Sequence, residues 1–573
     1  ILFQHDSAAG AGAGRDAQEY FERTGERSRW TNSIFGGMPT YQMAPSYDST
    51  KSLSWVEKTY QLYLPEYVVL TFIMMLGFYI LLRAFGISAW LAGFGGIIWA
   101  FSSYFFILIP AGHIWKFVTL AYIPPTIAGI VLAYRRKYLL GGIITALFIA
   151  LQIRSNHIQM SYYFMFVILF IIGAYFEEAY KKKELTHFFK ASAILALAAM
   201  VGVCINLSNL YHTYEYSKET MRGKSELKQE GNAANQTSSG LDRDYITNWS
   251  YGIGETLTLL VPNVKGGASS DNLSQSETAM EKANPMYSSI YSQFPQYFGD
   301  QPWTAGPVYV GAFVMFLFVL GCFIVKGPLK WALLGATIFS VLLSWGKNFM
   351  GLTDFFIDYV PMYNKFRAVS SILVIAEFTI PLLAIFALKE ILGRPEILKL
   401  KENRTGVIVS LVLTAGVSLV LAVAPSVFFS SFVTAQEMAA LQQGLPAEHL
   451  TPVVTNLTEM RKAIIASDAW RSFFIIAVGC FLLFLFLQKR LKASFTLVGI
   501  VLLCLVDMWC VNKRYLYDEQ FVPKSKRTEA FVKTQADEII LRDTAPDYRV
   551  LNFVGFPSNT FNENNTAYWH KSV

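Results

Sequence analysis

Long apolar runs dominate the hydrophobic pattern of this chain. A helix that crosses a bilayer needs about 20 mainly apolar residues, and each run is close to that length. Only a few residues separate several of the runs, which predicts tight helical hairpins. The twelve predicted membrane helices cover residues 66–85, 88–109, 115–134, 138–153, 158–176, 189–208, 306–325, 329–345, 369–388, 406–428, 470–488 and 493–511. The abrupt apolar start without Met indicates a chain cut within or just after a thirteenth helix, which ends at Ile1–Phe3.

Lys and Arg in the short connections indicate the orientation of these helices. If residues 1–65 are external, alternation places basic residues in every internal connection. These residues are Arg83, Arg135, Arg136, Lys137, Lys181, Lys182, Lys183, Lys190, Lys326, Lys330, Lys389, Arg394, Lys399, Lys401, Arg404, Lys489, Arg490 and Lys492. The long segments 1–65, 209–305, 346–368 and 429–469 are then external loops. We therefore expect the working face to be external.

The chain divides into a transmembrane domain, residues 1–512, and a polar C-terminal region, residues 513–573. In the second part, residues 525–540 predict an amphipathic helix and residues 548–553 predict a strand. This region is interpreted as the start of a small external α/β domain that is truncated at Val573. The expected fold is an all-α polytopic membrane protein with 12–13 transmembrane helices and long external loops.

Composition supports a membrane protein and narrows its chemistry. The chain is 53% hydrophobic and only 16% charged, whereas soluble domains carry roughly 25% charged residues. The five cysteines lie in apolar runs without paired spacing, which predicts neither a disulfide framework nor a zinc site. A phosphate-binding loop of the GxxxxGK[ST] kind is missing from the sequence, which argues against an ATP-driven pump.

Ionisable residues near the ends of membrane helices are costly, so they are candidates for function. On the external side these are Asp6, His113 and Lys116 in AGHIWKF, Arg154 and His157 in IRSNHIQMSYY, Glu255, Asp300, and Lys365 and Arg367 in YNKFRAVSS. A lone Lys at such a position is usually a snorkelling anchor. However, both short external turns pair a His with a cation, and a phosphate would supply their missing partner. A divalent metal is left open, because no tight ligand spacing supports one.

These features suit sugar transfer from a lipid-phosphate donor at the external membrane surface. The phosphate would contact Arg or Lys, and a carboxylate would deprotonate the incoming hydroxyl. Asp6 is the predicted base, with Glu255 and Asp300 as secondary acidic candidates. Segment 30–42, WTNSIFGGMPTYQ, fits a loop over the site in which Trp30, Asn32 and Tyr41 contact the sugar. A packed loop with aromatic anchors explains the same segment equally well.

Several stretches together resemble the YfhO family of bacterial polytopic membrane proteins. They are QHDSAAG, WTNSIFGGMPTYQ, GHIWKF, SNHIQMSYY, YGIGETLTLLVPN, GDQPWTAGPVYVGA, YNKFRAVSS and NTFNENNTAYWHKS. The family is similar in architecture to GT-C glycosyltransferases, which use polyprenyl-phosphate sugars. The resemblance implies that Asp6 matches the GT-C acidic position and that Arg367 and Lys365 match the loop that meets the donor phosphate. It also implies a cytoplasmic-membrane location and a cell-envelope acceptor such as teichoic acid. The single Asp, in place of a paired acidic motif, leaves metal dependence unknown.

The first interpretation is therefore an inverting GT-C-like glycosyltransferase that moves a sugar from a polyprenyl-phosphate donor to an envelope glycan or polymer. His113, Lys116, Arg154 and His157 are further donor-phosphate contacts. Membrane lipid and the membrane proteins that make and flip the donor are expected partners, and nucleic acid is not. A lipid or glycolipid flippase is the first alternative, favoured by Asp507 within the last helix. A non-catalytic envelope assembly factor is the second.

Overall fold

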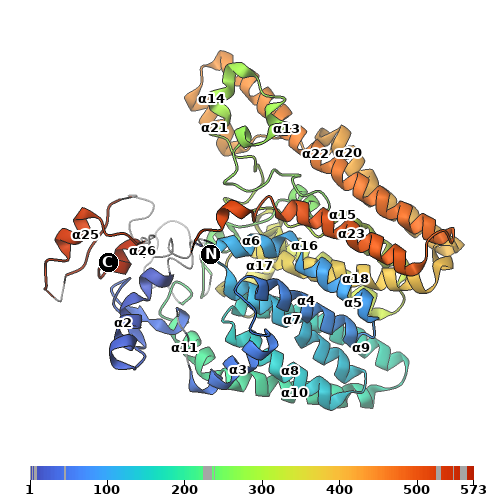
Figure 1. Cartoon of the computed structure of the whole chain (residues 1–573), viewed down its shortest axis with the longest axis horizontal. Coiled ribbons are helices and arrows are strands. Elements are labelled where there is room, and N and C mark those ends of the chain that lie inside the picture. The colour runs from blue at the N-terminus through green and yellow to red at the C-terminus, as the bar shows by residue number, and fades with distance from the viewer. Residues whose placement is uncertain are drawn as a thin grey trace.

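The computed structural model describes residues 2, 4, 10–43, 45, 47–223, 235–237, 239–523, 531–545, 548–554 and 564–573. This part of the chain is built almost entirely of helices that lie side by side (Figure 1). Its one sheet pairs two short antiparallel strands, β1 (Trp30–Thr31) and β2 (Met38–Pro39). The fold is therefore that of an all-α polytopic membrane protein, as the sequence predicts.

Seven helices in the described part of the chain are long and apolar enough to cross a membrane, and two bent pairs raise this to nine. The seven are α7 (Ile114–Tyr134), α9 (Ile158–Lys181), α10 (Leu185–Ile205), α18 (Val374–Gly393), α19 with α20 (Lys401–Leu411 and Val417–Val423), α22 (Ala447–Leu487) and α23 (Ala493–Asn512). The bent pairs are α5 (Ala89–Ala100) with α6 (Ser103–Ala111), and α16 (Pro328–Ser344) with α17 (Met350–Tyr359).

Three shorter apolar helices complete the bundle. They are α4 (Val68–Ala84), α8 (Tyr138–Arg154) and α15 (Ala312–Ile324). Together with the longer helices and the bent pairs, they account for all twelve predicted runs. Of the helix predicted to end at Ile1–Phe3, only Leu2 is among the described residues.

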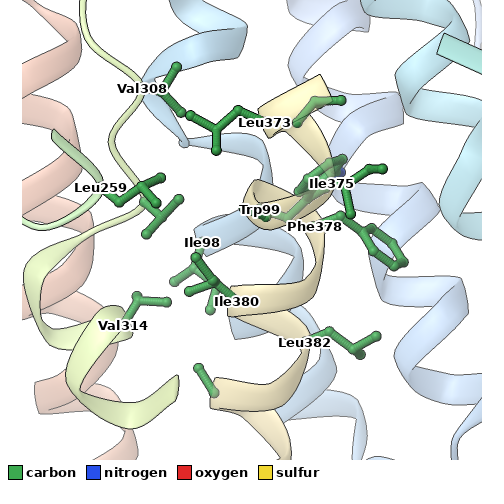
Figure 2. Packing of buried hydrophobic residues seen from close by; sticks show 14 of the residues in the cluster. Ile98, Trp99, Leu259, Val308, Val314, Leu373, Ile375, Phe378, Ile380 and Leu382 are labelled. Atoms are coloured by element: carbon green, nitrogen blue, oxygen red, sulfur yellow. The ribbon is translucent and has the colours of Figure 1, made fainter. Parts of the chain in front are cut away.

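Helices α7 and α18 form the centre of the bundle. In the most apolar stretch of each, 89% of the residues are buried, against 28–39% in the other five long helices. Figure 2 shows Ile375, Phe378 and Ile380 of α18 packed beside Trp99 of α5. The Trp99 ring stacks on Phe78 and meets Phe378 edge to face, which are favourable aromatic geometries. The two central helices therefore hold whatever polar groups they carry away from lipid.

A separate lobe projects from the bundle (Figure 1). It consists of α13 (Glu277–Met280), α14 (Ser288–Tyr291), α21 (Ala435–Gly444) and the first half of α22. The lobe has an apolar core of its own, in which Tyr291 packs with Leu441, Val453 and Leu457. Arg461 of α22 is fully buried and pairs with Glu437 of α21 at 2.5 Å. The lobe is thus a folded unit fused to a membrane helix.

Segments far apart in sequence meet beside the same end of the bundle. They include α2 (Arg15–Thr24), α3 (Lys51–Tyr60), α11 (Leu207–Ser217), α12 (Arg243–Thr247), α25 (Gln535–Ile540) and α26 (Asn564–Trp569). The Arg15 guanidinium lies over the rings of Tyr568 and Trp569, at 4.3 and 4.4 Å from their centres. The Ser572 N–H donates to the Ser33 carbonyl at 2.8 Å. We call this end, which carries residues 10–43, 47–67, 207–223 and 239–311, the loop-rich end.

Two predictions for the C-terminal region need correction. The helix predicted over 525–540 is only Gln535–Ile540 in the described residues, and residues 524–530 lie outside them. The strand predicted over 548–553 is wrong, because only Val550 makes a bridge, to Ser572. A strand needs a partner of comparable length, and here the partner amounts to one residue. The described residues of this region therefore contain no sheet.

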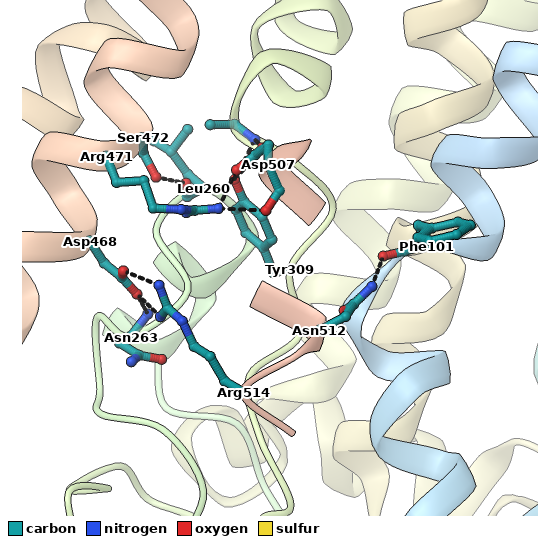
Figure 3. Close-up of polar contacts among 11 residues, drawn as sticks. Phe101, Leu260, Asn263, Tyr309, Asp468, Arg471, Ser472, Asp507, Asn512 and Arg514 are labelled. Atoms are coloured by element: carbon teal, nitrogen blue, oxygen red, sulfur yellow. Dashed lines mark hydrogen bonds and ion pairs between the residues drawn. The ribbon is translucent and has the colours of Figure 1, made fainter. Parts of the chain in front are cut away.

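Buried ion pairs join the last two membrane helices to each other, and hydrogen bonds join them to neighbouring elements (Figure 3). Asp507 of α23 pairs with Arg471 of α22, and its carboxylate also accepts the Tyr309 hydroxyl at 2.7 Å and the Ala312 N–H at 3.2 Å. Arg514 donates two hydrogen bonds to Asp468, at 2.7 and 2.8 Å. Asp507 is the residue that favoured the flippase alternative in the sequence analysis. In the structure its carboxylate is fully engaged in holding helices together.

We expect Arg471→Met to lower the free energy of unfolding by about 3–5 kcal/mol, because it leaves the Asp507 carboxylate buried without its cation. Thermal unfolding in detergent measures the loss. Lys462→Met is the matched control, since Lys462 lies on the same helix but pairs with Glu459 at the surface. Equal unfolding midpoints for the two variants would contradict the prediction.

Glycines set the close approach of α7 and α8. A Cβ atom on Gly141 would lie 2.5 Å from the Ala133 nitrogen and 2.7 Å from the Gly129 carbonyl oxygen, and neither backbone atom can move aside easily. Small residues at such contacts are how membrane helices pack tightly. We expect Gly141→Ala to destabilise the fold by about 1–3 kcal/mol.

The matched control is Gly173→Ala, because a Cβ there on α9 meets no atom within 4 Å. Unfolding midpoints in detergent compare the two variants. A midpoint that falls as far in the control as in Gly141→Ala would show that tight packing is not the cause.

Candidate functional site

Two short turns bring His113, Lys116 and His157 to the loop-rich end. Helix α6 ends at Ala111 and is capped by Gly112, whose φ of +83° is left-handed, and α7 begins at Ile114. Helix α9 follows Asn156, whose φ is +62°. Gly and Asn tolerate this conformation better than other residues, so the chain can reverse within two or three positions. His113 and His157 therefore directly precede their helices, and Lys116 lies in the first turn of α7.

Lys116 is a buried ammonium group without a carboxylate partner. The whole Lys116 residue is only 8% exposed. Nζ donates to the Ser371 hydroxyl at 3.1 Å and lies 4.9 Å from the centre of the Tyr104 ring. Among the described residues, no carboxylate oxygen lies within 4.0 Å of this nitrogen. A buried charge normally has an ionic partner, so this position suits an anion.

His157 lies close enough to Lys116 and His113 to be affected by their charges. Burial, reinforced by the positive charge of Lys116, lowers the pKa of His157 to about 3. Its Nδ1 atom is buried and has no hydrogen-bond partner among the described residues. His157 is therefore a neutral imidazole at physiological pH, beside a cation that needs a counter-ion.

Arg367 and Lys365 lie on the segment that leads into α18, and their environments differ. Arg367 is exposed, donates to the Tyr245 hydroxyl at 2.7 Å, and lies over the rings of Tyr245 and Trp249. Lys365 donates to the carbonyls of Arg222 and Ser239, at 2.7 and 3.0 Å. The structure thus gives Lys365 two bonds that hold loops together, and it leaves Arg367 presented to solvent.

Gln159 and Ser371 connect this segment to the two turns. Gln159 of α9 donates to the Arg367 carbonyl at 2.7 Å and to the Tyr163 hydroxyl at 3.0 Å. Ser371, four residues after Arg367, accepts the bond from Lys116. We call His113, Lys116, His157 and Arg367 the cationic cluster. The name refers to the charges of Lys116 and Arg367. The members come from three separate parts of the sequence, near the starts of α7, α9 and α18, and the Arg367 side chain points to Tyr245 and Trp249.

Glu377 is a residue that our sequence analysis missed. It lies on α18, is 0% exposed, and accepts a short hydrogen bond of 2.5 Å from Ser102. Its second oxygen, Oε1, has no partner among the described residues. Its charge attracts that of Lys116. A Glu in the apolar stretch VIAEFTIP is itself a signal, because ionisable residues inside a membrane helix are rare and often functional.

Arg154 does not join the cationic cluster. Its guanidinium forms an ion pair with Glu57 of α3 and donates to the Ser54 hydroxyl at 2.7 Å. Glu57 also accepts the Tyr122 hydroxyl at 2.9 Å. Arg154 therefore faces α3, although it lies only three residues before His157.

The acidic candidates are dispersed. Asp6, the predicted base, lies outside the described residues. Glu255 is buried and accepts bonds from the Gly252 N–H, the Tyr297 hydroxyl and the Gln301 amide, between 2.8 and 3.0 Å. Burial raises the pKa of Glu255, and these bonds oppose the rise. Asp300 is exposed and accepts from Asn348 at 3.0 Å. Glu255 thus serves bonds within its own loop, and Asp300 links that loop to the segment that contains Asn348.

The three residues predicted to contact the sugar lie in two different environments. Trp30 is half exposed, and its indole N–H donates to the Asn32 side chain at 3.0 Å. Both line a surface cavity of about 450 Å³ together with Asp16 and Tyr20. Tyr41 instead stacks on His212 of α11, with ring centres 4.8 Å apart. Trp30 and Asn32 remain able to meet a ligand, whereas Tyr41 is a packed anchor.

Comparison with known proteins adds no assignment: no protein-family model, curated protein or solved structure matches this chain. The class that the fold defines is an all-α multi-pass membrane protein. The resemblance to the YfhO family stays a prediction that rests on the quoted stretches. In the part of the chain that the structure describes, no three His, Cys, Asp or Glu side chains gather in a group that could hold a metal ion.

The low pKa of His157 gives a pH dependence with a defined sign. As pH falls through the ordinary histidine value of about 6.5, the unfolded chain binds a proton at His157 and the folded chain does not. Stability therefore falls, by about 2 kcal/mol between pH 7 and pH 5 for this group. We expect His157→Gln to reduce the acid-induced drop in unfolding midpoint. A drop of the same size in wild type and variant would refute the assignment.

Proposed function

We propose that this protein is a membrane glycosyltransferase that uses a sugar linked to polyprenyl phosphate. The observation that carries the proposal is Lys116, a buried ammonium group with no carboxylate partner among the described residues. It lies at the loop-rich end of the bundle, where a lipid phosphate would meet it, and exposed Arg367 lies on the neighbouring segment. Arg offers a planar pair of donors and Lys a point charge, which together suit a phosphate.

In this proposal the donor's apolar chain lies along the helices and its phosphate binds Lys116 and Arg367. The acceptor hydroxyl attacks the anomeric carbon, and the bond from that carbon to the phosphate oxygen breaks in the same step, so the configuration inverts. The hydroxyl proton passes to a carboxylate, and polyprenyl phosphate leaves. Asp6 is proposed as this base from its sequence position alone. His157, being neutral, would contact the phosphate through an N–H donor and not through a charge.

The family resemblance supports the same reading. The stretch GHIWKF supplies His113 and Lys116, and YNKFRAVSS supplies Arg367 and the Ser371 that bonds to Lys116. Both stretches are among those that resemble the YfhO family, and both belong to the site. We propose the outer face of a bacterial cytoplasmic membrane as its location and an envelope glycan or polymer as its acceptor.

Sugar transfer by the full-length protein in lipid vesicles tests the proposal. Vesicles receive a panel of undecaprenyl-phosphate sugars and an envelope extract, and transfer is measured for wild type, Lys116→Met and Arg367→Ala. A lost charge-assisted hydrogen bond costs about 1.5–3 kcal/mol, so we expect each variant to lower kcat/KM by about 10- to 100-fold. Lys218→Met is the matched control, because Lys218 is an exposed cation paired with Glu215.

The outcomes separate the competing functions. Asp6→Asn should abolish transfer if Asp6 is the base, and unchanged transfer would move the search to another carboxylate. Movement of the lipid-linked sugar across the vesicle membrane without transfer would favour a flippase. Binding of an envelope protein without either activity would favour an assembly factor. Equal transfer by wild type, Lys116→Met and Arg367→Ala would overturn the phosphate site.

A further inference from the structure

A second polar cavity lies at the loop-rich end, and the proposed transfer reaction does not use it. Its volume is about 540 Å³, and it lies between α3, the start of α7, the turn before α9 and the junction of α10 with α11. Ser54, Glu57 and Arg154 line one part, and Trp115 of α7 lines another. Trp115 and Lys116 are neighbours in sequence, but Lys116 turns to Ser371 and is not among the lining residues. The cavity and the cationic cluster are therefore adjacent but separate.

Three asparagines in the wall of this cavity have incomplete hydrogen bonding. Asn156, Asn206 and Asn209 all line it. Asn206 and Asn209 are only 1% and 4% exposed. The buried atoms Asn156 Nδ2, Asn206 Oδ1 and Asn209 Oδ1 each lack a partner among the described residues. Buried polar groups are nearly always hydrogen-bonded, so three such atoms around one cavity call for a ligand.

The other halves of these amides are fixed, which determines what they offer. Asn206 Nδ2 donates to the carbonyls of Ala150 and Gly202, at 3.0 and 3.2 Å. Asn209 Nδ2 donates to Asn156 Oδ1 at 3.1 Å. These bonds orient each amide, so the set offers two acceptors and one donor in a small space. A hydroxyl group both donates and accepts, and a ring that carries several hydroxyls matches this arrangement.

Two further features define the ligand. The Trp115 ring is 41% exposed and lines the cavity, so it can cover the apolar face of a sugar ring. Of the three cations that line the cavity, Arg154 pairs with Glu57 and Lys51 pairs with Asp48, and Arg27 forms no ion pair among the described residues. The excess of positive charge favours a ligand with an anionic group.

We propose that this asparagine-lined cavity binds a saccharide that carries a negative charge. The site is assigned by its own residues and does not depend on the transfer reaction, because binding can be measured without any donor or acceptor. The proposal also assigns a role to Arg154, because its ion pair with Glu57 forms part of the wall of the sugar site. The saccharide can come from a soluble glycan or from the head group of a glycolipid.

Binding of N-acetylglucosamine 1-phosphate to the full chain in lipid nanodiscs tests the proposal. Isothermal titration compares it with N-acetylglucosamine and with inorganic phosphate, which carry only the sugar or only the charge. We expect the sugar phosphate to bind most tightly, and we expect Trp115→Ala and Asn209→Leu each to weaken it about tenfold or more. Trp90→Ala is the matched control, since Trp90 is 86% exposed on α5 and does not line the cavity.

A second arm distinguishes the source of the saccharide. Nanodiscs that contain polyprenyl-phosphate N-acetylglucosamine replace the soluble probe, and binding confined to them and weakened by Trp115→Ala assigns the site to a glycolipid head group. Three results would overturn the proposal: wild type binding neither probe, inorganic phosphate binding as tightly as the sugar phosphate, or unchanged affinity in both Trp115→Ala and Asn209→Leu. A loss of binding confined to Lys116→Met would place the ligand at the cationic cluster instead.

Discussion

A charged group buried among apolar helices must find a partner, and this constraint organises the whole structure. Where the protein supplies both charges, as with Arg471 and Asp507, the result is a fastening between helices. Where no carboxylate contacts the cation directly, as with Lys116, which Glu377 attracts without forming an ion pair, we propose that an incoming anion completes the position. The same rule therefore stabilises the packing of helices at one position and supports the proposal of an anion site at another. The two central helices, α7 and α18, make this contrast sharp because almost none of their surface meets lipid.

The membrane helices could be predicted well from the sequence, because each one is indicated by its own run of apolar residues. An apolar run of membrane length remains visible whatever surrounds it, so all twelve runs have counterparts in the structure. The bends between α5 and α6 and between α16 and α17 could not be predicted in this way, since a run of apolar letters does not reveal a break in direction. The prediction of a strand over 548–553 failed for a related reason: the segment has the alternation of a strand, but among the described residues its only partner is Ser572.

The site could be predicted only in part, because side-chain direction depends on distant partners. Lys116 and His157 lie close enough to affect each other, and Gln159 links the backbone of Arg367 to α9, but the shared phosphate site stays a prediction. Arg154 also lies at the loop-rich end of a helix, as His157 does, but its ion pair with Glu57 turns its side chain toward α3. The sequence near residue 154 does not indicate this ion pair. Glu377 could have been found, since a lone carboxylate in an apolar run is itself conspicuous. Its proximity to Lys116, by contrast, needed the packing of α7 against α18.

The meeting of the N-terminal and C-terminal segments has a consequence for how the protein is made. Arg15 donates to the Tyr568 carbonyl across a separation of 553 residues, and Ser33 accepts from Ser572. A ribosome must therefore deliver every membrane helix before the first hairpin acquires its final contacts. Until the C-terminal segment has been synthesised, the β1–β2 hairpin lacks these contacts. Assembly of the loop-rich end is thus a late event in biogenesis, and membrane insertion precedes it.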